Sequence, residues 1–297
     1  MIETLLSGQL LAAAFATGVM FALVALGLNL VYGTMRLLNV AHGDLVMLGG
    51  YGGYWLFTLI GLSPLLALFV TAAGGGLLAW LAYRGLFARM LGTGSAPVRL
   101  EANSLLVFFG LSIVIQNLVA YVFSATPRGY SYLSEVHTFG DVALTGNRIA
   151  AALVATAFLA GVMIFLRLHH TGLALRAVIE RREAAAVVGV DIDRIQSLSF
   201  IVGFASAAIA GTLISMTEQV TPFMGFPFTI AAFVVIIMGG LGHIGGGIVA
   251  ALLLGIIQTY GVALTSSTYR SILLYAVFVG ILIVRPQGLF TRRRTLR

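Results

Sequence analysis

The run Leu10-Leu-Ala-Ala-Ala-Phe-Ala-Thr-Gly-Val-Met-Phe-Ala-Leu-Val-Ala-Leu-Gly-Leu-Asn-Leu-Val-Tyr32 contains no charged side chain. A helix that crosses the hydrocarbon core of a bilayer needs about 20 apolar residues, and this run is long enough. It is too long for the core of a secretory signal peptide, and no basic residue precedes Arg36. We therefore expect the run to be a retained membrane span.

Further apolar runs follow along the rest of the chain. They cover approximately residues 44–61, 64–87, 103–123, 149–168, 198–217, 227–241, 245–264 and 271–284. Only 9% of the 297 residues are charged, whereas a soluble domain carries about 25%. The sequence predicts an all-α, polytopic transmembrane bundle of about eight or nine spans, forming a single domain over 1–297. Runs 44–61 and 227–241 are short and rich in glycine, so each can be a broken or re-entrant helix.

The basic residues indicate the orientation of the spans. All 17 are arginine, and the net charge is +7. If the runs alternate from an outer N-terminus, fourteen arginines lie inside and only Arg128, Arg148 and Arg270 lie outside. This agrees with the positive-inside bias of membrane proteins, so the charge gives no reason to expect nucleic acid as a partner. We expect an outer N-terminus and a cytoplasmic C-terminus, with loop 124–148 periplasmic and loop 167–197 cytoplasmic.

The residue types present exclude several kinds of catalytic site. The chain contains no lysine and no cysteine, so it has no P-loop lysine, thiol nucleophile or disulfide. The patterns Gly-x-Ser-x-Gly and His-Glu-x-x-His do not occur either. We expect no enzyme activity, no cofactor and no ATP hydrolysis by this chain alone. Uphill transport would need a partner or an ion gradient.

The densest polar cluster beside an apolar run is Asn39-Val-Ala-His-Gly-Asp44. Polar groups near membrane depth are costly and usually face a cavity or a partner. We predict a turn that borders or gates a solute pathway. The alternative is local structure, in which Asp44 caps a helix that begins at Leu45. His42 has no second ligand at a useful spacing, so no metal site is expected.

Two other polar residues at membrane depth, Gln116 and Glu218, are also candidates for the pathway. The predicted pathway residues are therefore Asn39, His42, Gly43, Asp44, Gln116 and Glu218. For the amide of Gln116, an interhelical hydrogen bond worth about 0.6 kcal/mol is an equally good explanation.

The chain also shows weak internal similarity. Asn39–Asp44 with Gly49–Gly53, and Gly239–Gly247, each place a histidine among glycines beside an apolar run. Transporters are often built from two repeats, and Gly-interrupted segments in corresponding positions mark the pathway. We predict that these two segments correspond.

Loop 167–197 holds nine of the 27 charged residues. In a helix over 172–189, Leu173, Ala177, Ala184 and Val188 would share one stripe. Arg176, Glu180 and Glu183 would lie along another. A charge-mixed amphipathic helix on the inner side is suited to docking a soluble partner. The alternative is a helix in the lipid interface, but such helices favour a one-sided basic face.

Several segments resemble one family of transport proteins. Glu183-Ala-Ala-Ala-Val-Val-Gly189 resembles the ATPase-docking signature of ABC importer permeases. Four further segments, with Asn39-Val-Ala-His-Gly-Asp44, resemble the permeases of branched-chain amino acid ABC importers. They are Gly27–Gly33, Met47–Tyr51, Phe233–Gly242 and Arg285-Pro-Gln-Gly-Leu-Phe290. The likeness covers about residues 8–290, and the Asn-x-Ala-His-Gly-Asp turn is similar to that of the shorter permease subunit.

The resemblance implies a transport complex in the bacterial inner membrane. It implies a second permease subunit, two cytoplasmic ATPase subunits and a periplasmic binding protein, with lipid around the spans. Leu, Ile or Val is the default cargo, and related systems carry urea, short amides or small organic acids. The ATPase-coupling residues would be Arg176, Glu180, Glu183, Ala184, Ala185 and Gly189.

Two features bear on the other functions open to the chain. Loop 124–148 contains Tyr130, Tyr132, Glu135, His137 and Asp141, a candidate surface for a binding protein. A stand-alone secondary transporter would need an intramembrane charge or ion site, and the runs hold few acids. An intramembrane enzyme would need a nucleophile with a base, and no such pair is present.

Overall fold

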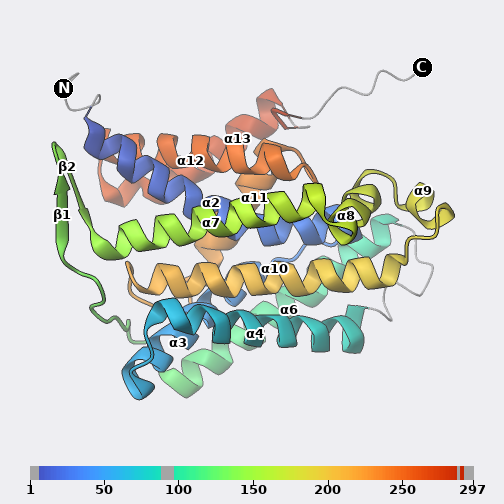
Figure 1. Cartoon of the computed structure of the whole chain (residues 1–297), viewed down its shortest axis with the longest axis horizontal. Coiled ribbons are helices and arrows are strands. Elements are labelled where there is room, and N and C mark those ends of the chain that lie inside the picture. The colour runs from blue at the N-terminus through green and yellow to red at the C-terminus, as the bar shows by residue number, and fades with distance from the viewer. Residues whose placement is uncertain (1–6, 88–96, 286–287, 291–297) are drawn as a thin grey trace.

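The computed structural model describes residues 7–87, 97–285 and 288–290. Its helices are α2 (Gly8–Met35), α3 (His42–Ile60), α4 (Pro64–Ala82), the π-helical turn η1 (Tyr83–Phe87), α6 (Pro97–Phe123), α7 (Gly146–Leu168), α8 (His170–Glu180), α9 (Arg182–Val187), α10 (Ile192–Ser215), α11 (Gly225–Gly239), α12 (Ile244–Leu264), the 3-10 turn η2 (Ser267–Tyr269) and α13 (Arg270–Val284). Strands β1 (Val136–Phe139) and β2 (Val142–Thr145) form an antiparallel hairpin. The hairpin lies at one end of the bundle and α8 and α9 lie at the other (Figure 1). We name these the hairpin end and the α8–α9 end.

The predicted all-α membrane bundle is confirmed. Seven helices in the described part of the chain are long and apolar enough to cross a membrane, with mean hydropathies of 1.8 to 2.6. The helices α3 and α11 are not among them, because α3 begins with polar residues and α11 has only 15 residues. These two helices correspond to the short, glycine-rich runs for which a broken helix was expected. Among the arginines used to predict sidedness, Arg89, Arg292, Arg293, Arg294 and Arg297 lie outside the described residues.

The first broken crossing follows α2. Residues 36–41 enter the bundle from the α8–α9 end, and α3 begins at His42, whose Nε2 lies 2.8 Å from the Val24 carbonyl oxygen. Val24 is about 16 Å from the end of α2, at about 1.5 Å per residue. In a hydrocarbon layer about 30 Å thick, α3 therefore begins near the middle. It then runs to the hairpin end.

The second broken crossing follows α10 and runs in the opposite direction. Residues 216–224 return from the hairpin end through turns, and α11 begins at Gly225, directly against Gly43. It ends at the α8–α9 end, where the following loop places Gly242 against Gly33 and Ile179. The N-termini of α3 and α11 therefore meet inside the bundle. The seven full helices and the two broken crossings together give the described chain nine crossings of the bilayer.

These elements form two repeats of opposite orientation. The first contains α2, α3, α4 and α6, and the second contains α10, α11, α12 and α13 (Figure 1). The long helices α2 and α10 cross where Gly27 and Gly203 face each other, each against the other's backbone carbonyl. Each half-helix follows the long helix of its own repeat. Helix α7 lies between the repeats and crosses the bundle once, so the second repeat begins at the end opposite to the first.

The internal repeat is therefore present, but the correspondence that the sequence suggested is wrong. Gly43 at the start of α3 is matched by Gly225 at the start of α11. The predicted partner segment, Gly239–Gly247, instead joins α11 to α12 at the α8–α9 end. The shared pattern of a histidine among glycines has a local role in the second segment, because His243 caps α12 by accepting a hydrogen bond from the Gly246 N–H.

Loop 124–148 contains the hairpin, which the sequence analysis did not predict. Its first part is tied to the bundle, because the Tyr130 and Tyr132 hydroxyls lie 2.9 and 3.0 Å from Ser215 and Ser63. Gln9 at the start of α2 bonds the backbone of Ala143 through both amide atoms. The two tyrosines therefore hold this part of the loop against the bundle. Glu135, His137 and Asp141 are exposed.

The expected single helix over 172–189 is wrong. The chain breaks at Arg181, which has extended backbone angles, and so forms α8 and α9. The break also divides the expected apolar stripe, since Leu173 and Ala177 lie in α8, and Ala184 lies in α9. Gly172 packs directly on the backbone of Phe165, and this contact sets the rotation of α8. Gly172, Leu175 and Val178 are consequently the buried residues of α8.

A substitution at Gly211 tests the contact between α10 and α3. A Cβ atom there would collide with the Val46 carbonyl oxygen, so Gly211→Ala forces two helices apart. We expect a loss of about 1–3 kcal/mol in unfolding free energy, typical of overpacking. The measurement is the thermal midpoint of the detergent-purified chain. Gly161→Ala is the matched control, because nothing lies within 4 Å of that position. Equal midpoints in the two variants would contradict the packing.

Candidate functional site

The two half-helices meet in a buried polar cluster, which we name the junction. It contains Asn39, His42, Gly43, Asp44, Gln116, Gly225 and Thr229. The Gly43 N–H donates to the Thr229 hydroxyl at 2.8 Å, and that hydroxyl donates to the Val40 carbonyl at 3.1 Å. From α6, the Gln116 amide donates to Asp44 Oδ1 at 2.9 Å. The junction thus joins both repeats and α6.

Five of the six predicted pathway residues come together here, and one does not. Asn39, His42, Gly43, Asp44 and Gln116 all belong to the junction. Glu218 lies elsewhere, beyond the end of α10, with its side chain 51% exposed. The sequence analysis missed Gly225 and Thr229. The signal that could have found them is the Pro222 and Pro227 punctuation around Gly225.

The alternative that Asp44 caps a helix starting at Leu45 is wrong. The helix α3 begins at His42, and its cap position, Ala41, makes no side-chain hydrogen bond. Asp44 lies in the first turn, and its Oδ1 is bound by Gln116. Its carboxylate also lies beside the start of α11, since a Cβ on Gly225 would be 2.6 Å from Oδ1. Because helix N-termini favour negative charge, both half-helices stabilise a carboxylate at this depth.

Several buried atoms of the junction lack hydrogen-bond partners among the described residues. They are both amide atoms of Asn39, Nδ1 of His42 and Oδ2 of Asp44. Asn39 and His42 are fully buried, and Asp44 is 1% exposed. Each unpaired buried group costs about 1–3 kcal/mol, so such groups usually mark a functional position.

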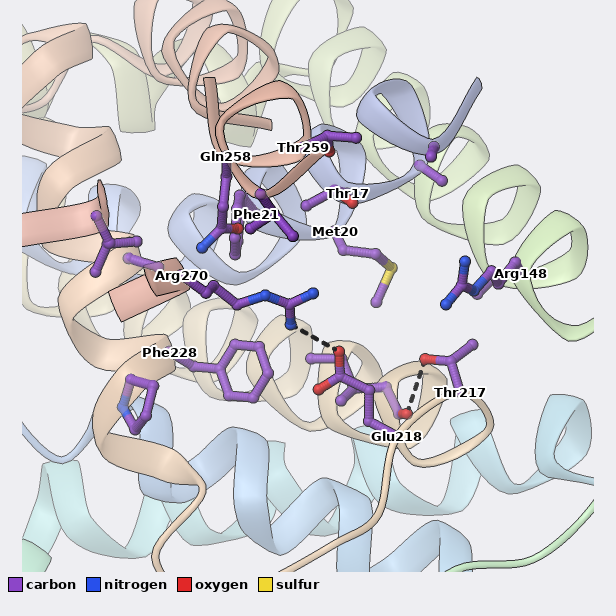
Figure 2. Close-up of a pocket in the computed structure, with 18 of the residues that line it drawn as sticks. Thr17, Met20, Phe21, Arg148, Thr217, Glu218, Phe228, Gln258, Thr259 and Arg270 are labelled. Carbon is purple, nitrogen blue, oxygen red and sulfur yellow. Dashed lines mark hydrogen bonds and ion pairs between the residues drawn. The ribbon is translucent and has the colours of Figure 1, made fainter. Parts of the chain in front are cut away.

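A cavity of about 520 Å³ opens near the hairpin end. It is enclosed by the first half of α2, the start of α7, the α10–α11 connection, α12 and the start of α13. Glu218 Oε1 and Arg270 form an ion pair of 3.6 Å inside it (Figure 2). Met224 just before α11, with Pro227 and Phe228 at its start, contributes to the wall, so the cavity reaches toward the junction.

The predicted ATPase-coupling residues lie at the α8–α9 end. Arg176, Glu180, Glu183, Ala184 and Gly189 are exposed, and Ala185 is buried. In the part of the chain that the structure describes, none of the three charged residues forms an ion pair. The sequence analysis missed Val187, which is 87% exposed beside Val188. Charged and apolar side chains together form an unpartnered surface here, which we name the α8–α9 elbow.

Among residues 7–87, 97–285 and 288–290, no group of three or more His, Asp or Glu side chains could hold a metal ion.

The model of the family described as branched-chain amino acid transport system / permease component matches residues 10–282. The chain belongs to this family. As expected for a permease component with seven apolar helices, it is a multi-pass protein of the inner membrane. No solved structure matches the chain.

The chain is similar to two kinds of permease protein, LivH or BraD on one side and LivM on the other. The high-affinity branched-chain amino acid transport system permease protein LivH of Salmonella typhimurium is 29% identical, covering 93% of this chain and 92% of LivH. BraD of Pseudomonas aeruginosa, with the same description, is 28% identical over 96% of this chain and 95% of BraD. LivM of Escherichia coli K12 is 27% identical over 92% of this chain but only 68% of LivM. The likeness to the shorter permease is thereby confirmed.

Removing the Gln116 amide tests the junction. Gln116→Leu removes the amide donor of the Asp44 carboxylate, at a cost of about 1–3 kcal/mol. We expect a matching fall in the thermal midpoint of the purified chain. The neighbouring Asn117→Leu is the control, because Asn117 is exposed and bonds only the Ile113 carbonyl of its own helix. A midpoint as high in Gln116→Leu as in Asn117→Leu would refute this role.

Proposed function

We propose that the chain is one of two permease subunits of an ABC importer for branched-chain or related amino acids, and that it forms half of the translocation pathway. Two partner ATPase subunits hydrolyse ATP, and a periplasmic binding protein delivers the solute. The junction is the observation that carries the proposal. Irregular backbone at membrane depth is tolerated only inside protein or along a cavity, and broken helices that meet near the midplane are typical of transport sites.

The α8–α9 elbow is the proposed docking site for an ATPase subunit. Arg176, Glu180 and Glu183 are free to form charge pairs with a partner, and Val187 and Val188 supply apolar contact area. An exposed apolar pair rimmed by charges is suited to a protein interface. The sequence Glu183–Gly189 resembles the docking signature of importer permeases.

One contact supports a mechanical link between the elbow and the pathway. Ile179 of α8 packs against both Gly33 at the end of α2 and Gly242 after α11. The helix α11 continues from that loop to Gly225 at the junction. A shift of α8 on ATP binding therefore reaches the junction through a rigid helix. ATP shifts the balance of two arrangements only by its differential affinity for them.

We propose an outer N-terminus and a cytoplasmic C-terminus, which place the hairpin end in the periplasm and the α8–α9 elbow in the cytoplasm. The arginine distribution supports this orientation. The exposed hairpin, with Val136 60% and Phe139 66% exposed, is then a contact surface for the binding protein. The cavity at the hairpin end opens toward the side from which the solute arrives.

Charge reversal tests the docking site. Glu183→Arg replaces an exposed acid with a base at the elbow, so we expect the ATPase subunits to be lost during purification and ATP-dependent uptake to fall. The matched control is Glu135→Arg, an exposed acid at the hairpin end, which should retain the ATPase subunits. Full ATPase retention and uptake in Glu183→Arg would remove the docking assignment. Leucine uptake by the purified chain in liposomes, without ATPase subunits, would instead favour a stand-alone transporter.

Single cysteines test the orientation, because the natural chain has none. Phe139→Cys and Val188→Cys are placed at exposed positions of opposite ends. We expect a membrane-impermeant maleimide to label Phe139→Cys in spheroplasts, in which the outer membrane is opened and the inner membrane is intact. Val188→Cys should react only after the inner membrane is opened. The reverse pattern would contradict the proposed sidedness.

A further inference from the structure

The cavity at the hairpin end brings three charged side chains into a mainly apolar site. Glu218 and Arg270 form the 3.6 Å ion pair there, with side chains 51% and 56% exposed. Arg148, from the start of α7, also lines the cavity, and Figure 2 shows it on the far side of Glu218 from Arg270. Within the described ranges, Arg148 has no ion-pair partner. Two cations therefore flank one anion.

The rest of the wall suits an aliphatic group. Met20 and Phe21 of α2, Phe228 of α11 and Leu274 of α13 all face the cavity. Its volume of about 520 Å³ lies within the range of about 300–1,000 Å³ that is usual for small-molecule sites. Gln258, only 6% exposed, also lines it, and its amide makes no hydrogen bond within the described part of the chain. A buried amide turned toward a cavity is a further polar contact for a ligand.

We propose that this cavity is a transit site for a zwitterionic α-amino acid with an aliphatic side chain. The carboxylate binds Arg148 or Arg270, the ammonium group binds Glu218, and the side chain lies against Met20, Phe21 and Phe228. Guanidinium groups match carboxylates in planar geometry. The assignment rests on the proposed function, and it names the solute class and the residues that recognise it.

The existing ion pair makes such a site weak and reversible. A half-exposed pair with a long single contact is only weakly favourable in water, so a zwitterion can replace each partner at little cost. A permease must release its solute, and a weak site avoids trapping it. Urea and short amides carry no charge that complements the three charged side chains, and a simple organic acid would place a second anion beside Glu218.

The test uses the complete permease–ATPase complex in nanodiscs without the binding protein. Saturation-transfer NMR compares leucine with 4-methylpentanoate, which lacks the ammonium group, and with 3-methylbutylamine, which lacks the carboxylate. We expect leucine to bind about fivefold better than either analogue, since each half-exposed charge pair contributes only modestly. Equal binding of the three ligands, or no leucine binding, would overturn the proposal.

Two variants separate recognition from a structural role. Glu218→Gln should weaken leucine about fivefold and leave 4-methylpentanoate unchanged or stronger, and Arg148→Gln should weaken the acid as well. Glu101→Gln, an acid outside the cavity, should change nothing. Unchanged leucine binding in both cavity variants, or an equal loss for all ligands, would contradict the assignment. ATPase retention and ATP-dependent uptake by the wild-type complex report on the proposed function separately.

Discussion

The backbone contact between Gly43 and Gly225 is the constraint on which the rest of the structure depends. A Cβ atom on either residue would collide with the backbone of the other, so each half-helix needs a glycine at this contact. At this depth no bulk water can satisfy the first N–H groups of a helix. The Thr229 hydroxyl accepts from the Gly43 N–H, and Asp44 places a carboxylate beside both helix starts. The acid at membrane depth thus belongs to the contact itself.

The inverted repeats give this contact its geometry. Helices α2 and α10 run in opposite directions and cross at Gly27 and Gly203. The half-helices that follow them therefore point to different ends of the bundle, α3 to the hairpin end and α11 to the α8–α9 end. A movement of one half-helix therefore changes the junction and one end of the bundle together. The cavity adjoins the start of α11, and Ile179 contacts the loop after its end. The cavity and the junction thus adjoin this single helix of 15 residues, and Ile179 links its far end to the α8–α9 elbow.

Much of the bundle could be predicted because membrane helices reveal themselves through length and hydropathy. The run 64–87 has the same limits as α4 and η1 together, and 227–241 differs from α11 by two residues at each end. The grouping of Asn39, His42 and Asp44 with Gln116 also follows from the cost of polar groups in lipid. Gly225 could not be paired with Gly43 from one sequence, because its neighbours are apolar and carry no polar signal. The rotation of α8 depends on the close contact of Gly172 with α7, which a helical pattern does not contain. Arg148 and Arg270 indicated only sidedness until the fold placed them around one cavity with Glu218.

A crosslink across the junction tests most directly whether movement between the two half-helices carries transport. The Thr229 hydroxyl bonds the Val40 carbonyl at 3.1 Å, so these residues of the two repeats are neighbours. The double variant Val40→Cys with Thr229→Cys is designed to join them by a disulfide, and the natural chain has no other thiol. The measurement is ATP-dependent leucine uptake by the reconstituted complex before oxidation, after oxidation and after reduction. The account predicts that oxidation abolishes uptake, that reduction restores it, and that neither single variant responds. Undiminished uptake by the fully crosslinked complex would contradict it.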